Sequence, residues 1–519
     1  MPSFSTELLV VGAGATGLGV AWDACLRGIK VVVVDQGGIG QGTSGRYHGL
    51  LHSGGRYATT DPDIARECAV ENSILRHIVP HVIEDSGGLY VSLNTDPPDY
   101  APEWFRTCQE IGIDVERIAP EEALKLEPSL TKDIARTFLL NDGALDSFDL
   151  LNSLAESIRQ IGGQIWLHHR LKGFVIEDNR IVAAQLFAEN EQETIQVGAD
   201  IVVNAAGPWT NEVTSFAGIN IPITHSRGTL IAMANRTVDH VIHRCRPPAS
   251  GDAIVPIGSV MVIGTTDVPV SSAEDLAIDP SEIDFLLHHG EELIPGLSTR
   301  RALRAWSGIR PLHDPGRHTP DTTRDVSRSH VLIDHAITDG IFGLLTIFGG
   351  KLTTFRYMAE QVVDVVAKEL HVEEECSTHS VLIYPQRKNY LLLTDRAKHL
   401  YQPCQAINDS VICECEIVTH SDVETSLRSG DQFSLDNLRS ETRLGMGPCQ
   451  AAFCAVRACA LANQSHETQE MLRDFFSFLD RRWKGTLPLA WGQSMRQMTL
   501  ARRIYLELLD VQQFMDDDS

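Results

Sequence analysis

A glycine-rich turn near the N-terminus constrains the fold of this chain more than any other feature. Residues 7–11 form a short β-rich run, Gly12, Gly14 and Gly17 then follow as G-x-G-x-x-G, and a helix-like stretch continues to Arg27. In this arrangement the first glycine permits the turn, the second lets the backbone approach a pyrophosphate, and the third lets the helix pack on the strand. The positive end of the helix then faces the phosphates. The pattern predicts a Rossmann-type dinucleotide site.

The segment after this unit favours FAD over NAD as the dinucleotide. A second apolar run, residues 30–34, ends in Asp35, at the spacing expected of an acid that binds the ribose. A loop of small and polar residues that includes Thr43 and Ser44 follows directly. Such loops commonly run beside a flavin pyrophosphate, so we expect Thr43 and Ser44 to contact the cofactor.

Length and charge narrow the class of protein. The chain has 519 residues and a formal net charge of -25. This length predicts two or three domains, and the acidic balance disfavours nucleic acid as a partner, because phosphates are bound by an excess of Lys and Arg. No window of 18 or more uncharged apolar residues and no secretory signal is recognisable, so we expect a cytoplasmic protein.

Six motifs in the first 370 residues carry a resemblance to a known family. They are GTSGR (42–46), LLHSGGRY (50–57), VVNAAG (202–207), IGTTD (263–267), SGIRPL (307–312) and GGKLTTFR (349–356). In this order they resemble FAD-dependent glycerol-3-phosphate dehydrogenases. The resemblance implies an α/β fold in which a Rossmann-type FAD domain is interleaved with an antiparallel-sheet substrate cap, as in D-amino-acid oxidase. Strand-like alternation at residues 180–186 and 260–263 is consistent with such a second sheet over the flavin.

The resemblance implies oxidation of sn-glycerol 3-phosphate to dihydroxyacetone phosphate, with hydride passing from C2 to the flavin. His52 is our candidate for the group that takes the hydroxyl proton, because imidazole titrates near neutrality. Arg56 and Arg310 are candidates for holding the phosphate, since guanidinium donors match a dianion, with Arg324 as a weaker third. Lys351 would add a charge near substrate or flavin.

Further cofactor contacts follow from the same motifs. We expect backbone close to the flavin at the glycines, and a hydroxyl contact from the threonine of the last motif. These residues are Gly207, Gly349, Gly350 and Thr353.

Four cysteines near the C-terminus come in pairs. Cys413 and Cys415 form C-x-C, and Cys449 and Cys454 form C-x4-C. Four thiolates suit either zinc or a [2Fe-2S] cluster, and the spacing alone leaves both open. The spacing resembles the small iron–sulfur domain typified by bacterioferritin-associated ferredoxin. Behind a flavin site this favours [2Fe-2S] over zinc, although Ala451 stands where related domains usually have glycine.

Cysteines of this kind narrow the resemblance to the anaerobic, multi-subunit branch of the family. That branch implies electrons passing through iron–sulfur partner subunits, one of which anchors the assembly to the membrane, and then to quinone in anaerobic respiration. It places the chain at the cytoplasmic face of the cell membrane and leaves room for FMN elsewhere in the assembly.

The chain is expected to divide into four parts. We assign residues 1–372 to the FAD domain and cap, 373–411 to a linker, 412–465 to a small helical [2Fe-2S] domain and 466–519 to a helical extension. The extension mixes basic and aromatic residues. These could meet anionic lipid or a partner subunit, or belong to ordinary helices that pack on the cysteine domain.

Two other functions fit the same sequence. One is a 2-hydroxyacid or amino-acid dehydrogenase on the same fold. The other is a non-catalytic flavin and iron–sulfur module that relays electrons or docks an iron-handling partner. The first predicts activity without a substrate phosphate, and the second predicts no flavin reduction by substrate.

Overall fold

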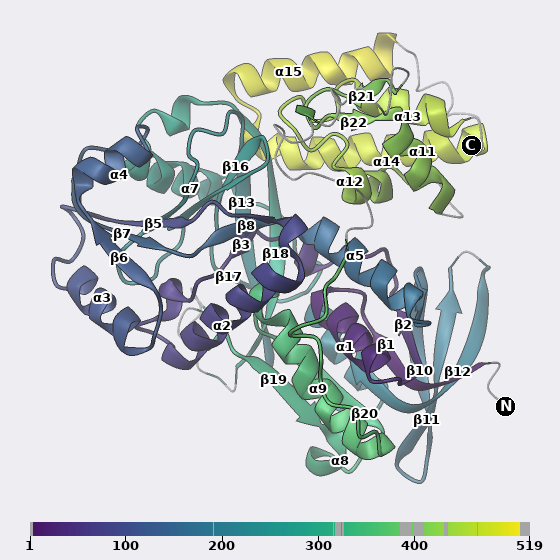
Figure 1. Cartoon of the computed structure of the whole chain (residues 1–519). Helices are drawn as coiled ribbons and strands as arrows, with labels where there is room; N and C mark the ends of the chain where they lie inside the picture. Colours follow the sequence, from purple (N-terminus) through teal and green to yellow (C-terminus); the bar gives the residue numbers. More distant parts are fainter. Residues whose placement is uncertain are drawn as a thin grey trace.

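The computed structural model describes residues 4–508, except 190, 315, 317–322, 324–325, 385–396, 399–408, 430–433 and 464–465. Arg324, most of the 373–411 linker and the end of the C-terminal extension therefore lie outside the described residues. The described parts form two large sheets and a C-terminal helical domain (Figure 1).

The first sheet grows from the strand, turn and helix of the N-terminus. β1 pairs in parallel with β2 on one side and with β12 on the other, β12 pairs in parallel with β20, and β9 extends β2. A β10–β11–β12 meander and the β19–β20 hairpin complete it. Its strands are β1 (Phe4–Val11), β2 (Val31–Val34), β9 (Gln164–Trp166), β10 (His169–Glu177), β11 (Arg180–Ala188), β12 (Glu193–Asn204), β19 (His330–Asp334) and β20 (Leu344–Gly349).

Both faces of the first sheet are covered, which explains the continuous apolar runs of its central strands. Alternate residues such as Leu8 and Val10 pack with helices on one face, and Leu9 and Val11 pack on the other. The first face carries α1 (Ala15–Leu26), α5 (Ser147–Gln160) and α9 (Phe355–Leu370) (Figure 1). The structure confirms the strand, helix and second strand predicted at the N-terminus.

The second sheet is the cap. It is antiparallel except for β5 and β14, which pair in parallel. Its strands are β5 (Gly88–Leu93), β6 (Val115–Ile118), β7 (Ile134–Leu140), β13 (Ile223–Met233), β14 (Val241–Arg244), β15 (Ala253–Ile257), β16 (Val260–Gly264), β17 (Val268–Val270) and β18 (Ala302–His313). A third, small sheet consists of β3 (Leu50–Leu51), β8 (Gly143–Leu145) and β4 (Ile83–Glu84). In the chain, these strands occur where the sequence passes from one large sheet to the other.

One sheet assignment from the sequence is wrong. Residues 180–186 lie in β11 of the first sheet, not in the cap, whereas residues 260–263 lie in β16 of the cap as expected. Alternation identifies a strand with one buried face, but it carries no information about which sheet that strand joins.

The other helices of this part join different cores. They are α2 (Pro62–Ile78), α3 (Tyr100–Glu110), α4 (Pro120–Leu126), α6 (Thr210–Ser215) and α7 (Pro280–Leu293), and a short α8 (His335–Thr338) follows β19. Leu75 of α2 packs on the first face of the first sheet, Val213 of α6 on its other face, and Leu286 of α7 in the cap. No helix among the described residues is both long and apolar enough to cross a bilayer.

The C-terminal domain has its own core. Its elements are β21 (Val411–Cys413), β22 (Val418–Thr419), α11 (His420–Ser429), α12 (Leu435–Thr442), α13 (Cys454–Ala462), α14 (Thr468–Thr486) and α15 (Gly492–Arg503). Phe475, Phe478 and Tyr505 of the basic and aromatic extension are buried in this core together with Cys413 and Cys454. These aromatic side chains therefore pack on the cysteine domain.

Buried ion pairs attach the C-terminal domain to the N-terminal half. The Arg443 guanidinium contacts Asp146, at the start of α5, and donates to Glu416 Oε2 at 2.9 Å. Glu416 also accepts a hydrogen bond from Ser259 of the cap at 2.9 Å, and Asn152 of α5 donates to Ser440 O at 3.3 Å. The residue after Cys415 is thus fixed against both the cap and the first sheet's helical layer.

Candidate active site

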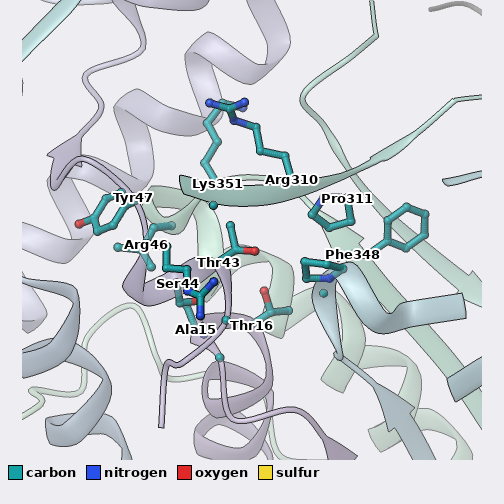
Figure 2. A pocket seen from close by; sticks show the side chains of 18 of the residues that line it. Ala15, Thr16, Thr43, Ser44, Arg46, Tyr47, Arg310, Pro311, Phe348 and Lys351 are labelled. Atoms are coloured by element: carbon teal, nitrogen blue, oxygen red, sulfur yellow. Dashed lines mark hydrogen bonds between the residues drawn. The ribbon is translucent and has the colours of Figure 1, made fainter. Parts of the chain in front are cut away.

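A cavity of about 1080 Å³ is lined by residues of both large sheets. The turn after β1, the loop 40–48 and the end of β20 form part of its wall, and β18 of the cap forms another part. In Figure 2 the side chains of Arg310 and Lys351 extend toward one end, while Ala15 and Ser44 lie toward the other.

Close packing explains two glycines of the first turn. Gly12 has φ +117°, and a Cβ there would lie 2.5 Å from Ala205 O. A Cβ on Gly17 would lie 1.9 Å from Gly12 O, so any larger residue would push α1 away from the turn. Gly17 therefore shapes the turn without lining the cavity itself.

Two polar side chains tie the nucleotide-side loops together. Ser44 Oγ accepts a hydrogen bond from Ala15 N at 3.0 Å, at the start of α1. Asp35 accepts from Ala13 N at 2.7 Å and from Gly37 N at 2.8 Å. Burial raises the pKa of Asp35, and these two bonds oppose the rise. Its carboxyl faces the cavity beside the helix N-terminus, where the sequence predicts a ribose ligand.

The structure brings most of the predicted site residues to this one cavity. Those that line it are Gly12, Gly14, Asp35, Thr43, Ser44, His52, Arg56, Gly207, Arg310, Gly349, Gly350 and Lys351. Thr353 does not line it, because its buried hydroxyl accepts the hydrogen bond from His52 N at 3.1 Å. Thr353 thus positions the His52 backbone and is not placed as a direct cofactor contact.

His52 is buried at the cavity wall and is uncharged near neutral pH. Burial lowers its pKa well below the ordinary histidine value, and the neighbouring His48 adds to the effect. The two rings lie edge to face with centroids 6.0 Å apart, and burial brings the pKa of His48 to about 3. A neutral imidazole can accept a proton from a substrate hydroxyl.

A buried acid behind His52 was missed in the sequence. Asp142 accepts a hydrogen bond from Ser53 N at 2.6 Å and lies 3.4 Å from His243 Nε2. Burial would raise its pKa, but His243 and His52 outweigh that effect and keep it below its usual value. Asp142 and His243 are far from His52 in sequence, and no motif links them.

Three positively charged side chains, those of Arg56, Arg310 and Lys351, line the cavity. Arg56 pairs with Asp252 at 3.0 Å, and this carboxylate outweighs burial and raises the pKa of the arginine. Arg310 lies over Gly228, where a Cβ would be 2.3 Å from its Nη2, and it donates to Thr265 Oγ1 at 2.5 Å. Lys351 Nζ lies 4.2 Å from the centre of the Tyr57 ring. All three side chains are suited to an anionic ligand.

A further arginine at the cavity was not selected from the sequence. Arg328 lines the cavity, its Nη2 lies 3.5 Å from Asp267 Oδ2, and its backbone carbonyl accepts from Lys351 Nζ at 3.2 Å. Although burial would raise the pKa of Asp267, Arg328 and two hydroxyl donors lower it to about 2. Arg328 lies in an irregular segment without glycine or proline, so no local pattern marks it.

The four paired cysteines also come together, here called the cysteine site. Cys413 lies close enough to Cys454, and Cys415 close enough to Cys449, for each pair to interact. The interaction with Cys454 and the Gly445 and Glu416 amides outweigh burial and lower the pKa of Cys413 to about 7. The described residues contain no arrangement of three or more ligands already set for one metal ion.

Local backbone explains part of this arrangement. Helix α13 begins at Cys454, so only this cysteine, and not Cys449 as well, lies at a helix N-terminus. Gly445 has φ +73°, and a Cβ on Gly447 would lie 2.5 Å from Cys415 Cβ. Ala451, the residue that stands in place of the usual glycine, has φ +67°, which is unfavourable for alanine.

The sequence is similar to those of known proteins along most of its length. The family described as FAD dependent oxidoreductase matches residues 7–356. The A subunit of the anaerobic glycerol-3-phosphate dehydrogenase of Escherichia coli strain K12 is 35% identical over 541 residues, which cover 99% of each chain. The A1 subunit of the Haloferax volcanii enzyme of the same name is 36% identical over 530 residues, or 96% of this chain and 90% of that one.

The chain belongs to the FAD-dependent oxidoreductase family. Within this family it groups with the A subunits of anaerobic glycerol-3-phosphate dehydrogenases. The solved glycerol-3-phosphate dehydrogenase from Bacillus halodurans, complexed with FAD, has a TM-score of 0.66 and 19% identity, and the match covers 95% of this chain and 97% of that one. These matches confirm the predicted fold class, an α/β fold with an FAD domain and a cap.

Proposed function

We propose that this chain oxidises the secondary alcohol of sn-glycerol 3-phosphate to give dihydroxyacetone phosphate. The named activity of its relatives supports the substrate. The observation that carries the proposal is the cavity itself, where Arg56, Arg310 and Lys351 converge beside the neutral His52. Bound FAD would accept the hydride that leaves C2.

His52 takes the proton of the C2 hydroxyl in this proposal. Its ring is held at the cavity wall by the bond from its own backbone N–H to Thr353 and by contact with Tyr57, whose ring centroid lies 5.4 Å away. Once protonated, the imidazolium is stabilised by the nearby Asp142 carboxylate, which acts on His52 electrostatically. Burial excludes bulk water from this transfer.

Arg310 binds the phosphate, with Arg56 and Lys351 as supporting cations. A guanidinium offers parallel donors to phosphate oxygens and stays charged when partly buried. Arg56 is paired directly with the Asp252 carboxylate, whereas Arg310 donates to the hydroxyls of Ser226 and Thr265. These hydroxyls orient the Arg310 guanidinium at the cavity, so we propose Arg310 as the main determinant of selectivity for a phosphorylated alcohol.

The residues present fit FAD. The turn at Gly12 and Gly14 and the N-terminus of α1 would hold the pyrophosphate, and Asp35 the ribose. Thr43 and Ser44 would lie beside the pyrophosphate, and Gly207, Gly349 and Gly350 leave room for close approach of the backbone. Lys351 would stabilise negative charge on the reduced ring.

The cysteine site is proposed to hold a [2Fe-2S] cluster. Its thiols interact in two pairs, Cys413 with Cys454 and Cys415 with Cys449. This arrangement supports a binuclear cluster, in which each iron takes two thiolates, over zinc, which needs all four around one ion. Backbone amides at Gly445 and Glu416 that donate to Cys413 also suit an iron–sulfur site.

Electrons are proposed to leave through this cluster to other subunits. The relatives are named as A subunits, which supports partner subunits for this chain. We place among them an iron–sulfur subunit that anchors the assembly to the inner face of the cell membrane, with quinone as the later acceptor in anaerobic respiration and FMN as a candidate second flavin. Within the chain, we propose residues 1–372, 412–465 and 466–519 as the oxidoreductase unit, the cluster domain and its helical extension.

Anaerobic flavin reduction tests the activity. The purified chain is mixed without oxygen with sn-glycerol 3-phosphate, glycerol or 2-hydroxyglutarate while the flavin absorbance is recorded. We expect bleaching by the first alone. Bleaching by 2-hydroxyglutarate but not by glycerol 3-phosphate would favour a 2-hydroxyacid dehydrogenase, and no bleaching by any substrate would favour a non-catalytic module.

A further inference from the structure

A group of arginines gathers where the C-terminal domain meets the cap. It comprises Arg301, just before β18, Arg304 within β18, Arg439 of α12 and Arg482 of α14, and is here called the basic cluster. Gly485 lets α14 approach β18, because a Cβ there would lie 3.2 Å from Ala305 O and 3.5 Å from Arg304 Nε.

The basic cluster has more donors than the described protein satisfies. Arg304 Nε, Arg439 Nε and Arg482 Nη1 are each buried without a hydrogen-bond partner among the described residues. Buried polar atoms are nearly always paired, because an unpaired buried donor loses its hydrogen bonds to water without replacement. Three such atoms on three neighbouring cations indicate that their counter-charge is a group the protein binds.

Carboxylates of the described residues supply only a small part of this counter-charge. Asp436 pairs with Arg439 at 3.2 Å, but it is shared with Arg481 at 2.8 Å. Arg304 instead lies 5.7 Å from the centre of the Trp306 ring, an uncharged partner. One shared carboxylate leaves a net positive charge inside a low-dielectric contact between domains.

Arg482 links the basic cluster to the backbone of the cysteine site. Burial, Arg304 and Arg439 lower the pKa of Arg482 well below its ordinary value, and the Cys449 and Cys454 thiolates oppose that change. Arg482 Nη2 also donates at 2.7 Å to the carbonyl of Gln450, the residue after Cys449. Arg482 therefore couples the basic cluster to the backbone next to Cys449.

On the cap side, the pKa of Arg301 shifts for similar reasons. Burial lowers the pKa of Arg301, and the thiolates of Cys449 and Cys415 oppose that change. Arg482 of α14 thus approaches the cysteine site through the Gln450 backbone, and Arg301 lies on the cap side, just before β18. The same strand, β18, carries Arg310 at the cavity.

We propose that the basic cluster is the resident counter-charge of the metal site and raises its reduction potential, which makes it an acceptor for electrons from the flavin. This inference rests on the proposed [2Fe-2S] cluster. One-electron reduction adds a negative charge to a site that is already anionic, so buried cations stabilise the reduced state more than the oxidised state. Arg482 makes the largest contribution, because its guanidinium donates to the backbone next to Cys449.

The reduction potential of the cluster tests this role. The full-length protein is titrated potentiometrically, and the reduced cluster is followed by electron paramagnetic resonance, in the native chain and in Arg482→Gln, Arg304→Gln and Arg439→Gln. We expect Arg482→Gln to shift the ratio of reduced to oxidised cluster at least about tenfold toward the oxidised state at fixed ambient potential, or about 59 mV for one electron. Arg304→Gln and Arg439→Gln should give smaller shifts in the same direction.

Two control variants separate charge from structure. Arg482→Lys keeps the charge and should keep most of the native potential. Arg428→Gln removes the same charge from the surface of α11, where the side chain is 79% exposed, and should leave the potential unchanged. Iron content and thermal melting are measured for every variant.

Each outcome bears on the proposal. Unchanged potentials in all three glutamine variants with native iron content would overturn it while leaving the cluster intact. Loss of iron in Arg482→Gln but not in Arg482→Lys would support a counter-charge, whereas equal loss in both would show that Arg482 acts by packing alone and overturn its role. A native protein without any cluster signal would contradict the proposed metal site and this inference with it.

Discussion

The active-site cavity and the cysteine site both set arginines against an anion, but they treat the positive charge differently. At the cavity, Arg56 pairs with Asp252, and Arg328 and Arg310 lower the pKa of Asp267, so carboxylates of the protein balance part of the positive charge before a substrate anion binds. At the cysteine site, Arg304 and Arg482 keep buried donors without a partner among the described residues, which suits an anion that stays. Internal pairing of cations therefore distinguishes a substrate site from a site for a resident group.

The largest effect expected is loss of attachment between the two regions. Replacing Arg443 by methionine leaves Glu416 and Asp146 buried without their cation, which should cost about 3–5 kcal/mol of folding free energy. Because these acids join the C-terminal domain to α5, we expect that domain to lose its melting transition first. Differential scanning calorimetry measures this.

The retained flavin spectrum is the control for this comparison. Arg443→Met should still bind FAD and still be bleached by glycerol 3-phosphate. If the melting temperatures of both regions fell equally in Arg443→Met, the two regions would not fold as separable units.

Substrate binding at the cavity comes next in size. Arg310→Ala should lower kcat/KM for glycerol 3-phosphate by about 10²–10³-fold, because the phosphate loses its main cation. Steady-state kinetics with an artificial acceptor measures this, with Arg66→Ala, a half-exposed ion-paired arginine of α2, as the matched control. An unchanged kcat/KM in Arg310→Ala would remove Arg310 from the phosphate site.

Proton transfer at His52 has the next largest expected effect. His52→Asn should lower kcat at least about a hundredfold. Because burial places the native pKa below 6.5, the imidazole stays neutral as pH falls through 6.5, so the acidic limb of the native pH–rate profile should lie below that value. An acidic limb above pH 7 that disappears in the variant would contradict a pKa lowered by burial.

The same shift has a consequence for stability. The unfolded histidine binds a proton near pH 6.5 and the folded one does not, so the contribution of His52 to stability is present above pH 6.5 and is lost as pH falls below it. Urea unfolding at several pH values should show a weaker decline in His52→Asn than in the native chain.

The smallest effect is at Ala451 in the cysteine site. Its φ of +67° costs an alanine about 1 kcal/mol relative to glycine, so Ala451→Gly should stabilise the C-terminal domain by up to that amount. Chemical denaturation with iron bound measures this, and Ala458→Gly in the middle of α13 should destabilise instead. A less stable Ala451→Gly would show that this turn does not limit the site.

The two regions also differ in how far sequence could predict them. The turn at Gly12 to Gly17 was predictable because its reasons are local: a strand, a tight turn and a helix N-terminus adjoin in the chain. Asp142 and His243 were not, because they meet only when the segment before β8 is brought to β14 of the cap. The two cysteine pairs, Cys413 with Cys415 and Cys449 with Cys454, indicated four ligands. The basic cluster was not predictable, because β18 of the cap brings part of it from more than a hundred residues away in the chain.

One measurement tests the central claim, that a substrate oxidised in the cavity reduces a cluster in the C-terminal domain. The native chain and Cys449→Ser are mixed with sn-glycerol 3-phosphate without oxygen and frozen for electron paramagnetic resonance, with flavin absorbance recorded in parallel. We predict flavin bleaching in both proteins and a reduced [2Fe-2S] signal in the native chain alone. Bleaching without any cluster signal in the native chain, at full iron content, would contradict the account.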